Sequence, residues 1–253
     1  MSNYSAFRLI ILVIFSLGAS VVVGQTNFIT QQKRFNRVNT AYIEKNDLIK
    51  ETLDKQDISI DKLNIIIIAF KEEQVLEIFA KENNGSSYSL ITEYPICASS
   101  GQLGPKRMSG DGQVPEGFYH INRFNPSSSF YLSLGLNYPN DSDLRKSTAT
   151  DPGSDIFIHG SCVTIGCLPM TDDYIKEIYL YAAYARQAGQ RKIPVYVFPF
   201  KMNDENMQKH VMENMENALL NFWRNLKSGY DLFFSGKKKL NIRVDREGHY
   251  LFL

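Results

Sequence analysis

The sequence has almost no excess of either charge and very little cysteine. Its 28 lysines and arginines face 27 aspartates and glutamates, so the net charge is +1. Proteins that bind nucleic acid by neutralising phosphates carry a clear basic surplus, and we therefore expect no nucleic-acid partner. The three cysteines are too few for a disulfide scaffold, and because their number is odd, at least one thiol is left unpaired within the chain.

Long hydrophobic runs are absent after residue 24. Residues 1–24 combine one positive charge at Arg8, an apolar run from Leu9 and small residues up to Gly24, which is the pattern of a secretory signal. The alternative is an uncleaved membrane anchor, but the run is shorter than the ~20 residues that a spanning helix needs. We expect an exported protein, periplasmic or in the cell envelope, whose signal is cleaved near Gly24. Cleavage removes Arg8 and no acidic residue, so the net charge of the mature chain falls from +1 to 0.

The composition excludes wholesale disorder, because 43% of the residues are hydrophobic and 22% are charged. A 3.6-residue period of apolar positions predicts one or two helices over 31–55. The β-branched run within 63–70 predicts a buried strand. Two further strands over 75–81 and 88–97 complete a meander, with turn residues between them.

The second half of the chain is predicted to hold helices and further strands. Thr171 is a suitable N-cap for a helix that ends at Gly189. A strand over 194–200, an amphipathic helix over 203–228 that ends before Gly229, and a terminal β-hairpin over 240–253 follow. No repeat or linker divides the mature chain. We expect an α+β fold, mainly antiparallel, with amphipathic helices on its N- and C-terminal sides.

Residues 101–154 are dense in glycine, proline, serine and asparagine, with aromatic residues between them. Disorder would not need so many aromatic side chains, so we expect ordered loops that shape a cleft.

The residues suited to chemistry lie in one short segment. His159 and Cys167 are eight positions apart, and Gly160 and Gly166 allow the chain to fold back between them. A thiolate is an effective nucleophile, and an imidazole close to the thiol can deprotonate it. Backbone N–H groups beside a glycine can approach a developing oxyanion. This spacing suits a cysteine acyl-transfer site.

Spacing alone leaves three other interpretations open. The histidine and the cysteine can simply pack against each other. His159, Cys162 and Cys167 can ligate zinc, although their spacing does not match a paired C-x-x-C framework. Cys162 can form a disulfide with Cys167, or Cys97 can compete for the same partner, and the sequence does not fix this connectivity.

The motifs resemble the active-site signature of the YkuD-type L,D-transpeptidases. That family has a histidine-glycine pair followed by Ser/Thr-x-Gly-Cys, which here are His159-Gly160 and Thr164-Ile165-Gly166-Cys167. Segment 110–119 resembles the family's threonine-proline-x-glycine-x-phenylalanine motif. Segments 96–106 and 124–139 resemble the YafK branch of the family. The resemblance covers residues 63–200 and implies a catalytic domain there, between an N-terminal helical region, 25–62, and a C-terminal helix and hairpin, 201–253.

The resemblance implies an exported cysteine acyl-transferase that acts on peptidoglycan stem peptides through a thioester, with no cofactor and no metal. It implies that Cys167 is the nucleophile, His159 the general base and acid, and Gly166 a backbone donor to the oxyanion. Gly160, Thr164 and Ser161 would support the site. Lys106 and Arg107 could meet a substrate carboxylate, with solvated surface charge as the alternative. We expect a monomer.

Two departures from the family pattern stand out. The segment between histidine and cysteine is short, and Ile165 replaces a second histidine, so His159 must be the base if the site is active. Since Cys167 must then stay reduced, Cys97 and Cys162 are the pair that can form a disulfide after export. Alternative functions are a hydrolase that releases a D-amino acid or a wall-attached lipoprotein, and a non-catalytic wall-binding module.

Overall fold

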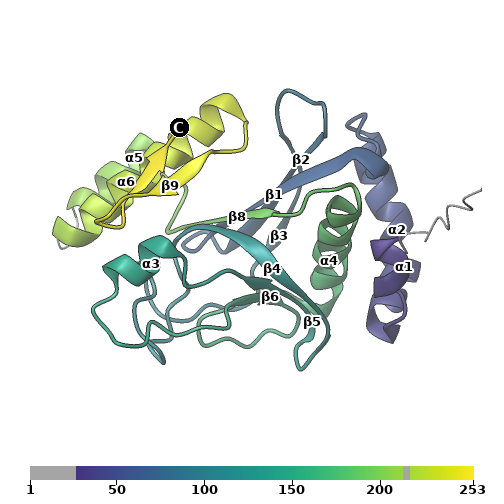
Figure 1. Cartoon of the computed structure of the whole chain (residues 1–253), viewed down its shortest axis with the longest axis horizontal. Helices are drawn as coiled ribbons and strands as arrows, with labels where there is room; N and C mark the ends of the chain where they lie inside the picture. Colours follow the sequence, from purple (N-terminus) through teal and green to yellow (C-terminus); the bar gives the residue numbers. More distant parts are fainter. Residues whose placement is uncertain (1–26, 213–216) are drawn as a thin grey trace, which may run out of the picture.

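The computed structural model describes residues 27–212 and 217–253, and the predicted signal segment lies outside them. The described chain is built on an eight-stranded sheet in the order β3-β2-β1-β8-β4-β5-β6-β7 (Figure 1). Neighbouring strands are antiparallel except for the pairs β1–β8 and β6–β7. The predicted α+β class, mainly antiparallel, is confirmed. Within the described residues, no helix has the length and apolar character needed to cross a membrane.

The helices and strands have the following bounds in chain order. They are α1 (Phe28–Gln32), α2 (Asn36–Asp54), η1 (Ile60–Lys62), β1 (Leu63–Phe70), β2 (Val75–Glu82), β3 (Ser89–Pro95), β4 (Gly117–Ser128), β5 (Tyr131–Leu136), α3 (Asp141–Lys146), β6 (Phe157–His159), β7 (Leu168–Pro169), α4 (Asp172–Gln187), β8 (Pro194–Phe198), α5 (Asp204–Met212), α6 (Asn217–Gly236), β9 (Ile242–Val244) and β10 (Tyr250–Phe252).

Strand β1 is buried on both faces, which explains its unbroken apolar run. Ile65 and Ile67 belong to the core that β1 shares with α2 and α4. Their neighbours Ile66 and Ile68 belong to a second core, which β1 shares with α6. Figure 1 shows the N-terminal helices and α4 on one side of the sheet and α5, α6 and the β9–β10 hairpin on the other.

The helix predicted from Thr171 is present as α4. The Thr171 hydroxyl accepts a hydrogen bond from the Tyr174 N–H at 3.2 Å, and two aspartates occupy the first turn, where the helix dipole favours them. Helix α2 packs against α4, and Lys45 of α2 pairs with Asp173 at 2.6 Å and Glu177 at 3.0 Å of α4. The predicted N-terminal helical region is therefore part of the first core.

The C-terminal helix differs from the prediction. The single helix expected over 203–228 is described as α5 and α6, and α6 continues through Gly229 to Gly236. A side chain at Gly229 would place its Cβ 2.5 Å from Phe118 and 2.6 Å from Phe252. This glycine therefore allows close packing inside the helix, where we had expected it to end the helix.

The glycine-rich region also differs from the prediction. Strands β4 and β5 and helix α3 occupy much of 101–154, and the remaining loop 96–116 is held by a buried network. The Glu116 carboxylate, which is fully buried, accepts hydrogen bonds from Lys71 at 2.8 Å and from the Trp223 indole at 2.8 Å. Because Trp223 lies on α6, this network joins the C-terminal helix to the loop beside the candidate site.

Candidate active site

His159 and Cys167 are brought together by a short parallel strand pair. In this pair Ile158 lies opposite Leu168 and His159 lies opposite Pro169, so Cys167 lies next to β7 on the side of Phe157. Side chains alternate between the two faces of a sheet, which puts His159 and Cys167 on one face. Ile158 and Leu168 point to the other face, where both are buried.

The two side chains line a common cavity of about 550 Å³, whose wall also includes Phe130, Phe157 and Ile165. Cys167 also lines a second cavity of about 360 Å³, which is formed with Lys71 and the loop around Ser100. Cys167 therefore borders two cavities. The free cysteine in the chain is this one.

The tautomer of His159 follows from its surroundings. Its Nδ1 lies 2.5 Å from the carbonyl oxygen of Gly160, which can only accept, so Nδ1 carries the proton and Nε2 holds the free lone pair. Phe130 stacks on the imidazole with ring centroids 4.6 Å apart. Burial lowers the pKa of His159 below its ordinary value, although the Gly160 hydrogen bond opposes this. At neutral pH the ring is a neutral base.

Burial is the largest influence on Cys167 and raises the pKa of its thiol. A backbone hydrogen bond from Phe157 and the charge of Lys106 lower this pKa, and the Asp155 carboxylate raises it. The thiol contacts the carbonyl oxygen of Asp155 at 3.7 Å. The resting site is therefore a neutral thiol with a neutral imidazole.

This resting state predicts the pH dependence of thiol alkylation. Because only the thiolate reacts and burial raises the pKa of Cys167, the iodoacetamide rate should have its midpoint above about 8.5, the value of an ordinary thiol. Unfolding in urea should shift the midpoint down to that value. The rate is read by mass spectrometry of the Cys167 peptide, and a midpoint below 7 in the folded protein would show a preformed ion pair.

Thr164 holds the turn that carries the nucleophile. Its hydroxyl oxygen accepts hydrogen bonds from the N–H of Gly166 at 3.1 Å and of Cys167 at 2.8 Å, and donates to the Cys167 carbonyl at 2.9 Å. The Gly166 N–H is thus bonded within the turn in this conformation, and its role as an oxyanion donor stays a prediction. Gly166 is needed for its φ of +133°, and a Cβ there would lie 2.9 Å from the Gln113 carbonyl.

Replacement of Thr164 by valine should therefore damage both stability and turnover. The change keeps the shape but leaves two N–H groups and one carbonyl without their partner, which we expect to cost about 1–3 kcal/mol of unfolding free energy. Urea unfolding measures this cost. Thr164→Ser keeps the hydroxyl and should stay close to the parent protein, and equal losses in both variants would contradict the assigned role.

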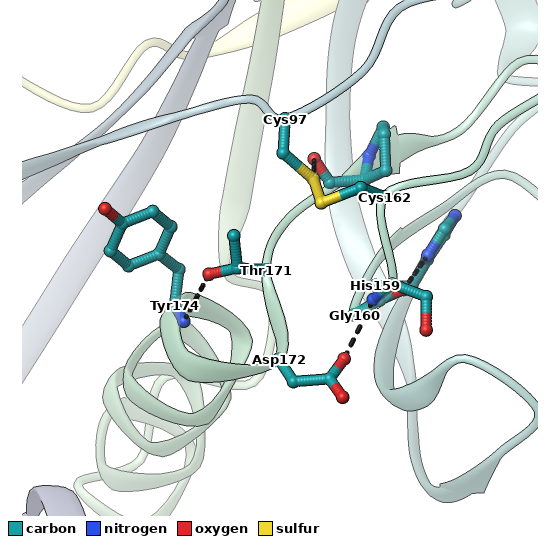
Figure 2. Close-up of a disulfide and its surroundings, with 9 residues drawn as sticks. Cys97, His159, Gly160, Cys162, Thr171, Asp172 and Tyr174 are labelled. Carbon is teal, nitrogen blue, oxygen red and sulfur yellow. Dashed lines mark hydrogen bonds between the residues drawn. A yellow bond between two sulfur atoms is a disulfide. The ribbon is translucent and has the colours of Figure 1, made fainter.

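Gly160 and Ser161 shape the start of the same segment, and Figure 2 shows Gly160 beside Asp172. The Ser161 N–H donates to the Asp172 carboxylate at 2.9 Å, and Ser161 has a φ of +65°. A Cβ on Gly160 would lie 2.6 Å from that carboxylate. Asp172 stands in the first turn of α4, so this helix fixes the backbone that follows His159.

A disulfide joins Cys97 to Cys162, with their Cα atoms 5.4 Å apart (Figure 2). The sequence-based pairing of these two cysteines is confirmed, and Cys167 keeps its thiol. The bond ties the chain after β3 to the segment between His159 and Cys167. Because the sulfur of Cys162 is used in the disulfide, the alternative zinc site with His159 and Cys167 does not form.

Comparison with known proteins agrees with this geometry. The model of the YkuD family, described as the L,D-transpeptidase catalytic domain, matches residues 64–197. The Escherichia coli K12 protein named "Putative L,D-transpeptidase YafK" is 38% identical over 182 residues, which is 71% of this chain and 70% of the relative. The chain belongs to the YkuD family of peptidoglycan L,D-transpeptidases.

Two solved structures are also similar. The helical cell shape determining protein Pgp2 of Campylobacter jejuni is 17% identical, with a TM-score of 0.43 over 72% of this chain and 74% of that one. Bd1075 of Bdellovibrio bacteriovorus is 22% identical, with a TM-score of 0.39 over 72% of this chain and 75% of that one.

Lys106 and Arg107 each form an ion pair in this YkuD domain. Lys106 is buried, and its ammonium pairs with Asp111 at 2.6 Å and donates to the Met108 carbonyl at 2.8 Å. Arg107 pairs with the buried carboxylate of Asp143 at 2.8 Å. Both cations therefore have carboxylate partners within the protein, and a contact with a substrate carboxylate stays a prediction.

Three residues of the YkuD site went unassigned in the sequence. Phe130 stacks on the His159 imidazole, Asp172 holds the Ser161 backbone, and Ile165, at 89% exposure, lines the larger site cavity. Of these three residues, Ile165 alone could be noticed in the sequence, because it stands where the family has a second histidine. Phe130 lies far from Cys167 in sequence, and the fold brings it near. Asp172 follows Cys167 by five positions, but its contact with the Ser161 backbone depends on how the segment folds back.

Proposed function

We propose that this chain is an exported cysteine acyl-transferase that acts on peptidoglycan stem peptides through a thioester on Cys167. The observation that carries the proposal is the free thiol at the junction of two cavities, with a neutral imidazole on one of them. A nucleophile, a base in the correct tautomer and room on both sides are the requirements of acyl transfer.

The reaction begins when His159 Nε2 takes the thiol proton as substrate binds. The thiolate attacks the carbonyl carbon of the peptide bond that follows the diamino acid of the stem. The imidazolium returns the proton to the departing amide nitrogen, so a D-amino acid leaves and a thioester remains on Cys167. An incoming amine then attacks the thioester, His159 takes the amine proton, and the thiol is restored.

The two cavities suit two substrates. The cavity of about 550 Å³ with His159 has Phe130, Phe157 and Ile165 in its wall. The cavity of about 360 Å³ borders Cys167 as well and is lined by the serine-rich loop around Ser100. One can hold the acyl donor while the other admits the amine, which favours transpeptidation. Where water enters in place of the amine, the same thioester is hydrolysed.

The disulfide supports export. Bonds of this kind persist in oxidising compartments and are rare in the cytosol. A Cys97–Cys162 bond beside the reactive thiol fits a protein that folds after it leaves the cytosol.

The test is incubation of the full mature chain with a defined tetrapeptide muropeptide, with and without an amine acceptor, followed by chromatography and mass spectrometry. We expect release of the terminal D-amino acid and a cross-linked product with the acceptor present. A shortened stem in both conditions would assign the hydrolase. Cleavage of a glycan bond, or no turnover of any stem peptide, would overturn the proposal.

A further inference from the structure

Two adjoining cavities lie away from Cys167. The first, about 640 Å³, lies where β4 and β8 meet the C-terminal hairpin, and the second, about 570 Å³, lies between β4, α1 and the end of α4. The two cavities share His120, Asn122 and Lys192. Neither contains a residue of the two cavities at Cys167. Together they form a surface that we call the basic groove.

The basic groove collects positive charge in a chain that is nearly neutral overall. Lys192 and Lys239 line the first cavity, and Arg186 and Arg191 line the second. The lining includes one acid, Asp141. Arg186 donates to the Arg191 carbonyl at 2.7 Å, and among the described residues none of these four cations has an ion pair within 4.0 Å.

The pKa of His120 reflects the positive charge around it. Its pKa is lowered by burial and, in addition, by the charges of Lys192 and Lys239. These two lysines come from the segment before β8 and the segment before β9, which are distant in sequence. The C-terminal extension therefore completes the groove, and its positive charges outnumber the one lining carboxylate, Asp141.

The lining indicates what kind of ligand fits. Ammonium and guanidinium groups bind carboxylates, and the amides of Asn122, Asn137 and Asn241 can donate to and accept from sugar hydroxyls and peptide groups. The groove is concave and is lined by as many asparagines as lysines and arginines together, which suits a discrete glycan–peptide better than a flat membrane surface.

We propose that the basic groove is an accessory site for a carboxylate-bearing glycan–peptide of the wall, separate from the stem that reacts at Cys167. The identity of this ligand rests on the proposed function, because that function places the chain at the wall. The groove would hold the polymer while the active site works on one of its stems, so it should affect binding to intact wall and not the chemistry on a small substrate.

The experiment compares two charge-matched double variants of the full mature chain. Lys192→Gln with Lys239→Gln alters the groove. Lys50→Gln with Lys238→Gln is the control, because both lysines are exposed and neither lines the groove. Binding to purified sacculi is measured by co-sedimentation in a Cys167→Ala background, so that the wall is not consumed. Turnover of a soluble tetrapeptide muropeptide is measured with Cys167 intact.

We expect the groove variant to bind sacculi about tenfold more weakly, the size of the loss of about one charge-assisted contact, while the control binds like the parent. Turnover of the soluble substrate should be equal in all three proteins. Equal losses in both variants, no loss in either, or competition by polyphosphate but not by soluble muropeptide would overturn the proposal. Failure of the parent to turn over any muropeptide would overturn the proposed function alone, since sacculus binding is measured without catalysis.

Discussion

Replacement of Cys167 by alanine should reduce turnover of a tetrapeptide muropeptide by about 10⁴-fold or more, because the hydroxyl groups that also line the cavity are far weaker acids than a thiol. The thiol is the free one in the chain and lines both site cavities. Cys167→Ser should lose nearly as much, since a hydroxyl is far less acidic than a thiol and the imidazole beside it is a weakened base. Release of the D-amino acid, followed by chromatography, measures the loss.

His159→Ala is the companion variant. It should lose turnover to a similar degree, because residues that act as a unit are not additive, while the Cys167 thiol stays open to slow alkylation. Urea unfolding of each variant controls for folding. Turnover within tenfold of the parent in the Cys167→Ala protein, with its fold intact, would remove Cys167 from the reaction and would leave the family's acyl-transfer chemistry without a nucleophile here.

Removal of the disulfide should produce the second large effect. The bond joins residues 65 positions apart, and in the chain-entropy model a loop of this length stabilises the folded state by about 4 kcal/mol. We expect Cys97→Ser with Cys162→Ser to lower the unfolding free energy by about that amount in urea. Turnover should fall as well, because the bond anchors the segment between His159 and Cys167.

A reductant distinguishes the effect of losing the disulfide from the effect of the two serine substitutions. Dithiothreitol should destabilise the parent protein toward the level of the double serine variant and leave that variant unchanged. A loss below about 1 kcal/mol would contradict the stabilising role. A Cys162–Cys167 bond found by peptide mapping of the oxidised parent would contradict the assignment of the free thiol.

The sequence was most informative where chemistry and backbone requirements coincide. His159, Cys167 and the glycines between them form one continuous segment, so the motif itself contains the nucleophile and the base. Gly160 and Gly166 are glycines because a Cβ would collide with Asp172 and with the Gln113 carbonyl. The start of α4 at Thr171 was also predictable, because an N-cap depends only on residues close together in sequence.

Features set by contacts between distant segments were not predictable. The sequence suggested that Gly229 ends a helix, whereas its role is to admit Phe118 and Phe252 from other elements. Nothing in the sequence indicated that Lys106 is buried, because its ion pair with Asp111 depends on how the loop folds. In the same way, the N–H groups of Gly166 and Cys167 were expected to face a substrate, but the Thr164 hydroxyl binds them both.

The most direct test of the central claim is intact-protein mass spectrometry of the mature chain within the first turnovers on a tetrapeptide muropeptide. Our account predicts an added mass equal to the donor minus its terminal D-amino acid, located on the Cys167 peptide, removed by hydroxylamine and absent from Cys167→Ala. Steady turnover with no such adduct under acid quench, or an adduct on another residue, would contradict it.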